Sequence, residues 1–462
     1  MSHLTRALAQ YVANPTFGDA REQAFRIAKL GFVDTVGTMI AGCSEPVVGI
    51  VLKHYEGCTE PEQAPIPFLG ISRPVMQAAC INATAGHALD YDDVAMAGHP
   101  STVLVPTILA EGHRLGRSGE DALKAYVVGY EVWSELVFRE PGKYHLKGWH
   151  PTGVLGTVAA AAAVAFLNRL DADTASTALA IAASMASGLV ANFGTMTKPF
   201  HAGRAASNGI EAVRLAMLGL TASPDVFEHK AGYLAALSIA GDADRDSPAS
   251  RLGGRPRILE TGLSIKRYPV CYSCHRSIDG AIRLVEENNL KPDDVKSVSV
   301  TIGPAQASML RNHTPQTGLE AKFSIEFAVA SALVSREVGL RQLTDTFVTQ
   351  PEIQSQFDKV STHINEEPCP LEPTFSFTDR VVMELVDGRV LDSGDIRFPL
   401  GNAENPMDEA GMRAKFLDCC ASGRAAGAKL GCDDPLLYSR LSTLESQSDL
   451  RGLFTAPESE KS

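Results

Sequence analysis

Apolar residues recur at helical spacing through about the first 260 residues of the chain, and alanine and glycine are dense among them. Helices are predicted at residues 21–42, 121–137 and 172–190. Ser118 and Asp121 can form a capping box ahead of the second of these helices, and Asp171 can cap the third. The pattern therefore predicts a large helical domain.

The periodicity changes near Gly253. Alternating β-branched residues predict strands at residues 263–270, 295–303 and 380–398. Asp387 followed by Gly388 is a strong hairpin signal within the last of these segments. Further helices are predicted at residues 277–290, 321–338 and 407–430. We therefore expect a mostly α protein in which a large all-helical domain, residues 1–261 and 401–462, accompanies a smaller α+β domain, residues 262–400.

Composition narrows the class of protein. The chain has 462 residues, and its 42 basic and 54 acidic residues give a net charge of -12, which argues against nucleic-acid binding. Nine cysteines, an odd number in a long chain, do not suggest a secreted disulfide scaffold. The N-terminus lacks a secretory pattern, and the most apolar stretch, residues 154–167, is too short to span a bilayer. We expect a cytoplasmic protein with no membrane partner.

Three predicted helix starts carry a basic residue directly before proline: His99-Pro100, His150-Pro151 and Lys198-Pro199. Proline favours the first helical position, so each basic residue should lie at or beside an N-cap. Free backbone N–H groups and the helix dipole attract carboxylate or phosphate there, and they disfavour the charged form of a histidine. Three such ends directed at one point would form an anion pocket with proton-transfer groups. Alternatively, they simply begin three surface helices.

The segment His87 to Ser101, HALDYDDVAMAGHPS, is the most polar candidate. Asp90 and Asp93 are three residues apart, so they would share a helix face that excludes Asp92. The segment lacks the glycine and glutamate of an EF-hand loop. A Mg²⁺ or Mn²⁺ site with two aspartates, or a polar helix end without chemistry, are the alternatives. We favour an acid/base or substrate-orienting role for Asp90, with His99 on the same wall.

The remaining cofactor motifs are weak. Cys271 to His275, CYSCH, matches the haem-attachment pattern, but no export signal accompanies it. A zinc site lacks a second ligand pair, and an iron–sulfur cluster would need Cys271, Cys274 and a distant third cysteine. No phosphate-binding glycine motif is present. We therefore expect no metal and no organic cofactor.

Four stretches, in this order, resemble the MmgE/PrpD family over nearly the whole chain. They are GHALDYDDVAMAGHPS, GWHPTGVLGTVAAAAAVA, GTMTKPFHAGRAASNGIEAVRLAMLGLT and IKRYPVCYSCHRSIDGAI. The resemblance implies a helical domain built from both chain ends, an α+β domain that acts as a lid, a homodimer and an active site between the domains. It also implies catalysis without cofactors on small di- or tricarboxylates.

The resemblance also implies roles for individual residues. Positions matching the catalytic and binding residues of the family's decarboxylase are Asp90, His99, His150, Lys198 and Lys266. Three further decarboxylase positions are replaced here by Val94, Cys271 and Phe327. His145 stands where the family's epimerase has a tyrosine, and Tyr144 is the residue beside it. We expect Asp90, His99, His150, Lys198 and Tyr144 to be catalytic, and Lys266, His201, Ser101, His145 and Cys271 to bind substrate.

Removing a proton α to a carboxylate builds negative charge that cations and helix N-termini stabilise. An acid that protonates a departing hydroxyl completes a dehydration, and acid and base on opposite faces give an epimerisation. We expect a lyase resembling 2-methylcitrate dehydratase. The alternatives are an isomerase resembling iminodisuccinate epimerase, a lyase resembling cis-aconitate decarboxylase, and a non-catalytic carboxylate-binding protein.

Overall fold

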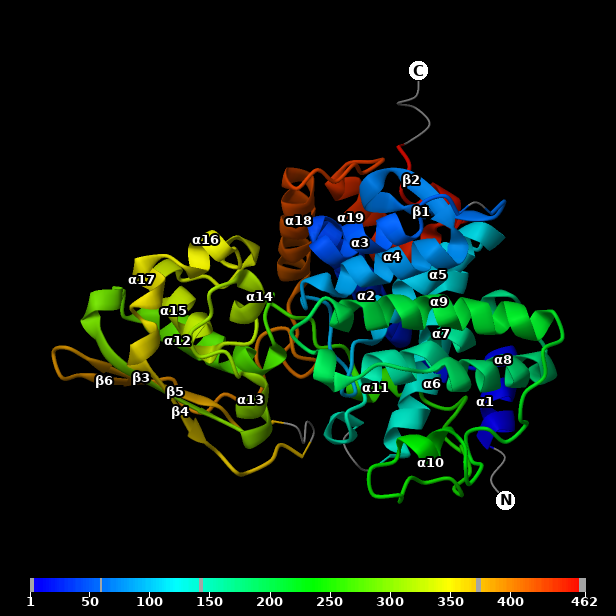
Figure 1. Ribbon diagram of the computed structural model, residues 1–462, viewed down its shortest axis with the longest axis horizontal. Coiled ribbons are helices and arrows are strands. Elements are labelled where there is room, and N and C mark those ends of the chain that lie inside the picture. Colours follow the sequence, from blue (N-terminus) through cyan, green and yellow to red (C-terminus); the bar gives the residue numbers. More distant parts are fainter. Residues whose placement is uncertain (1–3, 59, 141–143, 371–374, 457–462) are drawn as a thin grey trace. The chain divides into compact units, whose positions relative to one another are not determined.

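A computed structural model describes residues 4–58, 60–140, 144–370 and 375–456 (Figure 1). The chain forms two compact units, which are described separately. The first consists of Met1–Ser264 and Asp408–Ser462, and the second of Ile265–Met407. The first unit is largely helical and the second combines helices with a sheet, which confirms the predicted mostly α fold with a smaller α+β part.

The helical unit is a packed array of long helices. Its helices are α1 (Leu4–Ala13), α2 (Arg21–Ala41), α3 (Pro46–His54), α4 (Val75–Ala88), α5 (Pro100–Leu115), α6 (Gly119–Phe138), α7 (Pro151–Leu167), α8 (Ala172–Met185), α9 (Thr197–Met217), α10 (Tyr233–Leu237), α11 (Ile258–Thr261), α18 (Glu409–Ala425) and α19 (Asp434–Ser442). Ser118 and Asp171 cap α6 and α8 as predicted, each by accepting backbone N–H groups.

Helix α7 lies at the centre of this unit. It packs against α5, α6, α8 and α9, and nearly every one of its residues is buried (Figure 1). Its alanine-rich sequence is apolar on all sides, as expected for a helix surrounded by others. Helix α9 also packs along α4, and α18, from the C-terminal part of the chain, packs against α2. The first residues of α5, α7 and α9 are therefore fixed by extensive core contacts.

The helical unit is not entirely helical, which corrects one expectation. Strands β1 (Gln63–Ile66) and β2 (Ile71–Pro74) form an antiparallel hairpin. Gly70, with φ +64°, makes the turn between them. Prolines at positions 65 and 74 obscured the strand pattern, because proline is tolerated only at strand edges and ends.

The α+β unit has a four-stranded sheet in the order β4-β3-β5-β6. Its elements are α12 (His275–Glu287), β3 (Val295–Ile302), α13 (Pro304–Met309), α14 (Gly318–Ala321), α15 (Ile325–Ser335), α16 (Asp345–Val348), α17 (Pro351–Gln354), β4 (Val360–Ile364), β5 (Arg380–Leu385) and β6 (Val390–Asp392). β3 pairs parallel with β4 and antiparallel with β5, and the β5–β6 hairpin turns at Asp387 and Gly388, as predicted. Helices α12 and α15 contact each other and the sheet.

Two predicted elements differ from the structure. Residues 263–270 form no strand; Ser264 makes only an isolated bridge with Val94, and Pro269 interrupts any longer ladder. The helix predicted at 172–190 ends at Met185, because Ala186 already adopts an extended backbone with ψ 128°, and Gly188 beyond it has φ +132°.

Among the described residues, no single helix is both long and apolar enough to cross a bilayer, although the segments Gly18–Ser44 and Pro46–His54, bent by 85° at their junction, are so as a pair.

Candidate active site

The connection between α4 and α5 carries the most polar cluster of the helical unit. α4 ends at Ala88, and α5 begins at Pro100 with His99 as its N-cap residue. Between them, Asp90 adopts φ +53°, so the chain leaves the helix at this point. The expectation that Asp90 and Asp93 share a helix face is therefore wrong. Aspartate tolerates this left-handed conformation better than most residues, so the sequence contains no glycine to mark the turn.

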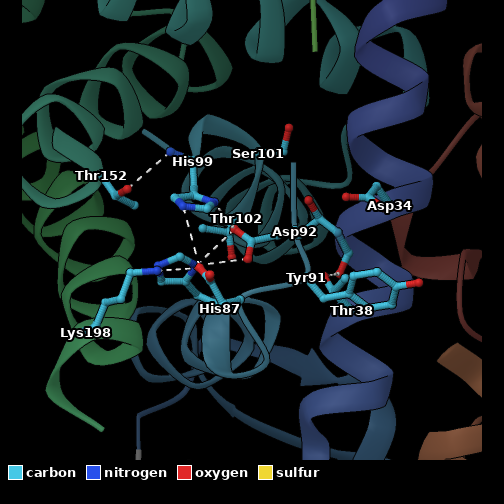
Figure 2. A network of polar contacts seen from close by, with 12 residues as sticks. Asp34, Thr38, His87, Tyr91, Asp92, His99, Ser101, Thr102, Thr152 and Lys198 are labelled. Carbon is cyan, nitrogen blue, oxygen red and sulfur yellow. Dashed lines mark hydrogen bonds and ion pairs between the residues drawn. The ribbon is translucent and has the colours of Figure 1, made fainter. Parts of the chain in front are cut away.

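Asp92, which helical spacing had excluded, lies between two imidazoles (Figure 2). Its carboxylate oxygens are 2.9 and 3.0 Å from Nδ1 of His87, and Oδ2 is 3.0 Å from Nδ1 of His99. Burial alone would raise the pKa of Asp92, but the two imidazoles hold it well below its usual value. An ionised carboxylate can only accept hydrogen bonds, so Nδ1 of His87 carries the hydrogen. The same carboxylate faces His99 and leaves Nε2 of that ring directed toward Asp90.

Asp90 contacts a buried lysine. The Lys198 ammonium donates to Oδ1 of Asp90, and Nε2 of His99 lies 3.8 Å from the same oxygen (Figure 2). α9 begins at Thr197 with Met196 as its N-cap residue, so Lys198 is the second residue of the helix and does not lie at or beside the N-cap as predicted. Pro199 is still compatible with this position, because N–H groups in a first turn have no helical partner. A cation, a carboxylate and an imidazole thus meet in a buried site.

His150 forms a second imidazole pair beside this cluster. It is the N-cap residue of α7, as predicted, and its Nδ1 lies 3.0 Å from Nδ1 of His201. Burial, and then the Lys198 charge, hold the pKa of His150 well below its usual value. The same two causes lower the pKa of His201. Gly188 accepts the His150 N–H, and a Cβ there would lie only 3.2 Å from the His201 ring.

His145 and Tyr144 are placed differently from each other. Burial, and then the charges of His99 and Lys198, lower the pKa of His145 to about 4. The Tyr144 hydroxyl instead donates to the Leu136 carbonyl at 3.4 Å, and burial raises the pKa of this phenol. His145 is therefore the member of this pair that senses the charges of the cluster.

Ser101 also points away from the histidines (Figure 2). Its hydroxyl lies 2.5 Å from that of Tyr126, and its side chain approaches Gly31 in α2. The neighbouring Asp93 is fully buried, and burial, followed by the charge of Asp34, raises its pKa well above the usual value. Both residues thus lie in the core behind the cluster.

Two further predicted binding residues, Lys266 and Cys271, belong to the α+β unit. Both are buried there, and the Cys271 N–H donates to the Lys322 carbonyl at 2.8 Å. Their roles in substrate binding stay predictions.

The cluster also contains the atom types of a metal site. One ligand atom from each of His87, Asp90, Asp92 and His99 lies within 4.8 Å of the others. However, the Lys198 ammonium already contacts Asp90, and the Asp92 oxygens face two imidazole nitrogens. A divalent cation would have to compete with that ammonium for the Asp90 carboxylate. The charges fit a lysine-centred site better than a metal-centred one.

Sequence reasoning identified most of this cluster but missed the roles of His87 and Asp92. Both lie in the segment singled out above, and the error came from extending α4 through Asp93. The density of acidic residues immediately before His99 was the available signal, because a buried histidine commonly has a carboxylate partner that fixes its tautomer.

The fold and this cluster define a helical protein that buries a cation, carboxylates and imidazoles together, an arrangement suited to acid–base chemistry. Family models match the chain twice: the MmgE/PrpD N-terminal domain at residues 6–246 and the MmgE/PrpD C-terminal domain at residues 268–429. The chain belongs to the MmgE/PrpD family.

Similar curated proteins cover most of the chain. A cis-aconitate decarboxylase of Homo sapiens is 28% identical over 429 residues, which cover 90% of this chain and 87% of the human protein. The Mus musculus cis-aconitate decarboxylase is 28% identical over 402 residues, with coverages of 83% and 79%. That of Aspergillus terreus is 24% identical over 444 residues, with coverages of 91% and 90%.

Proposed function

We propose that the protein is an acid–base enzyme that acts on a small di- or tricarboxylate and transfers a proton at the carbon α to a carboxylate. One observation carries this proposal: the buried ammonium of Lys198 contacts Asp90 near His150, whose pKa is held well below its usual value by burial and then by the Lys198 charge. A carboxylate of the substrate can replace Asp90 as a partner of that ammonium. The charge that develops in the transition state then faces a preorganised cation.

In the proposed reaction, His99 and His150 transfer protons and Lys198 binds a carboxylate. Asp92 fixes the orientation of the His99 ring, which presents Nε2 as the proton acceptor. His150 is neutral at pH 7, and a bound anion nearby would favour its charged form and so strengthen it as a base. Asp90 shares the Lys198 ammonium until the substrate enters.

Dehydration is the first reaction we propose, with 2-methylcitrate as the model substrate. One imidazole takes the proton from the carbon α to the carboxylate, the C–O bond to the hydroxyl breaks, and a second group protonates the departing oxygen. The products are an alkene and water. With acid and base on opposite faces of the substrate, the same groups would instead return a proton to the other face, which is an epimerisation.

Decarboxylation is the second candidate, because the similar proteins named above are cis-aconitate decarboxylases. In that reaction a C–C bond to a carboxylate breaks, CO₂ leaves, and an imidazole protonates the carbanion. Val94, Cys271 and Phe327 weigh against decarboxylation, because each replaces a functional residue of the family's decarboxylase.

A single NMR experiment separates these reactions. The protein is mixed in D₂O with 2-methylcitrate, citrate, cis-aconitate or iminodisuccinate, and ¹H spectra are followed with time. Dehydration yields a new alkene from a hydroxy acid, decarboxylation yields an alkene with one carboxylate fewer, and epimerisation exchanges the α proton for deuterium. Binding without turnover or exchange across this panel and a broader set of carboxylates would instead indicate a carboxylate-binding protein.

A further inference from the structure

A second buried ion pair lies beside the turn that carries the acidic residues of the site. Lys415 on α18 and Asp34 in the middle of α2 are both buried, and Nζ lies 2.5 Å from Oδ1 of Asp34. Neither residue carries a role in the chemistry proposed above. Because ions are costly to bury, their presence in an otherwise apolar helix interface requires an explanation.

The Lys415 ammonium makes two further contacts, both to Tyr91. It donates to the Tyr91 carbonyl at 2.9 Å and lies 4.0 Å from the centre of the Tyr91 ring. Tyr91 is the residue between Asp90 and Asp92, and Figure 2 shows its ring on the side of α2, away from Lys198. One ammonium thus holds the backbone and the side chain of the residue that joins the two acidic groups.

That backbone needs an external restraint. Asp90 has φ +53°, and Met96 and Ala97, later in the same connection, also have positive φ. Such conformations cost free energy and persist only where surrounding contacts fix them. Val94 and Ser264 each donate a backbone N–H to the carbonyl of the other, which fixes the middle of the connection. Val94 follows Asp92 in sequence, so these two bonds do not hold the turn at Asp90 and Tyr91.

We propose that Lys415 is a positioning residue for the reaction proposed above: its ammonium, oriented by Asp34, holds the turn at Tyr91 so that Asp90 meets Lys198 and Asp92 meets His87 and His99. The expected effect of Lys415 on kcat rests on the proposed function. Its expected effect on the positions of the His87 and His99 rings rests on the geometry alone. It assigns a role in the site to α18, which is otherwise a packing helix of the C-terminal segment.

The test compares Lys415→Met with Phe416→Leu. Phe416 is the adjacent residue on α18, buried against Gly37 and Tyr438, so its truncation weakens the same helix contact without altering the bond to Tyr91. Because an unpaired Asp34 can prevent Lys415→Met from folding, the double variant Asp34→Asn, Lys415→Met is prepared as well. It retains no buried charge at this position and still lacks the donor to Tyr91.

Two readouts are recorded for each variant, at a temperature at which thermal unfolding shows all of the compared variants to be folded. Spectra of ¹³C-labelled histidine report the rings of His87 and His99, with exposed His363 of the α+β unit as an internal control. We expect the His87 and His99 signals to shift in the Lys415 variants and to stay in place in Phe416→Leu. With a substrate identified, kcat should fall roughly 10²-fold, the scale of an ångström-sized misplacement, with a smaller change in KM.

The outcomes separate the two proposals. Wild-type protein that turns over no carboxylate contradicts the proposed function, while the histidine spectra still decide the role of Lys415. The positioning role is wrong if the double variant shows the wild-type His87 and His99 signals, or if its kcat equals that of Phe416→Leu. In either case Lys415 only stabilises the packing of α18 against α2.

Discussion

At the residue scale, the site depends on which groups are charged. The ion pair of Lys198 with Asp90 and the contact of Asp92 with two imidazoles confine charge to a few buried atoms. Low dielectric strengthens each of these interactions and makes an unpaired member costly. The effects of substitutions on kcat and KM should therefore depend on whether a substitution removes a proton carrier, an orienting group or the carboxylate-binding cation.

Kinetic constants should separate proton carriers from the binding cation. His150→Gln and His99→Gln should each lower kcat by roughly 10²-fold or more with modest change in KM, the usual scale for lost acid–base catalysis. Lys198→Ala should raise KM strongly, because it removes the cation that binds a carboxylate. Steady-state kinetics on the substrate found by NMR provide the measurement. Near-normal kcat in both histidine variants, with turnover abolished in Lys198→Ala or Tyr144→Phe, would reverse these assignments.

Stability should fall as pH falls because buried histidines resist protonation. Burial lowers the pKa of His87 to about 3, against about 6.5 in an unfolded chain. Between those values the unfolded state binds more protons, so this histidine makes stability rise with pH, by at most about 1.4 kcal/mol per pH unit. His87→Gln should flatten the dependence of Tm on pH between 6.5 and 4. The exposed His363→Gln is the control, and equal slopes in all three proteins would contradict the prediction.

At the scale of elements, prediction succeeded where local signals act alone. The caps Ser118 and Asp171, the α5 and α7 starts at His99-Pro100 and His150-Pro151, and the β5–β6 turn are set by residues adjacent in sequence. It missed β1 and β2, where local prolines hide the strand pattern. It also missed the turn after α4, where Asp90 contacts Lys198 of α9 and the Tyr91 carbonyl accepts from Lys415 of α18, contacts that no local pattern can reveal.

The connection between α4 and α5 should be sensitive to a single methyl group. A Cβ on Gly98 would lie 2.6 Å from the Trp133 ring, so Gly98→Ala should destabilise the protein by about 1–3 kcal/mol, the usual cost of overpacking. Gly49→Ala in α3 meets nothing within 4 Å and should be neutral or stabilising by up to about 1 kcal/mol. Urea unfolding of both variants measures this, and equal stabilities would refute the steric argument.

At the scale of the whole molecule, the sequence predicted two kinds of unit, because patterns of period 3.6 and 2 segregate along the chain. The resemblance to the family came from four motif stretches instead. It also located Asp90, His99, His150 and Lys198, of which Asp90 contacts both His99 and Lys198. It did not single out Asp34 or Lys415, because one buried charge on an apolar helix has no meaning until its partner is known. The homodimer implied by the family stays a prediction.

Activity should be independent of divalent metal. The Lys198 ammonium already contacts Oδ1 of Asp90 and would compete with a divalent cation for this carboxylate, so dialysis against a chelator should leave kcat and KM unchanged. Elemental analysis of the same samples provides the check, with Asp90→Ala as a variant that lacks one candidate ligand. Stoichiometric zinc or iron whose removal abolishes activity would instead make His87, Asp90, Asp92 and His99 a metal site.

The bond from Lys415 to Tyr91 has a consequence for synthesis on the ribosome. Residues up to Ser264 emerge first, with Asp34 already in place but without its cationic partner. The whole of Ile265–Met407 must leave the exit tunnel before α18 can close that long loop, and domains generally fold as they emerge. The turn at Asp90 and Asp92 therefore receives the restraint from Lys415 only after α18 has been synthesised, and a chain truncated before α18 should fold in part but lack an ordered active site.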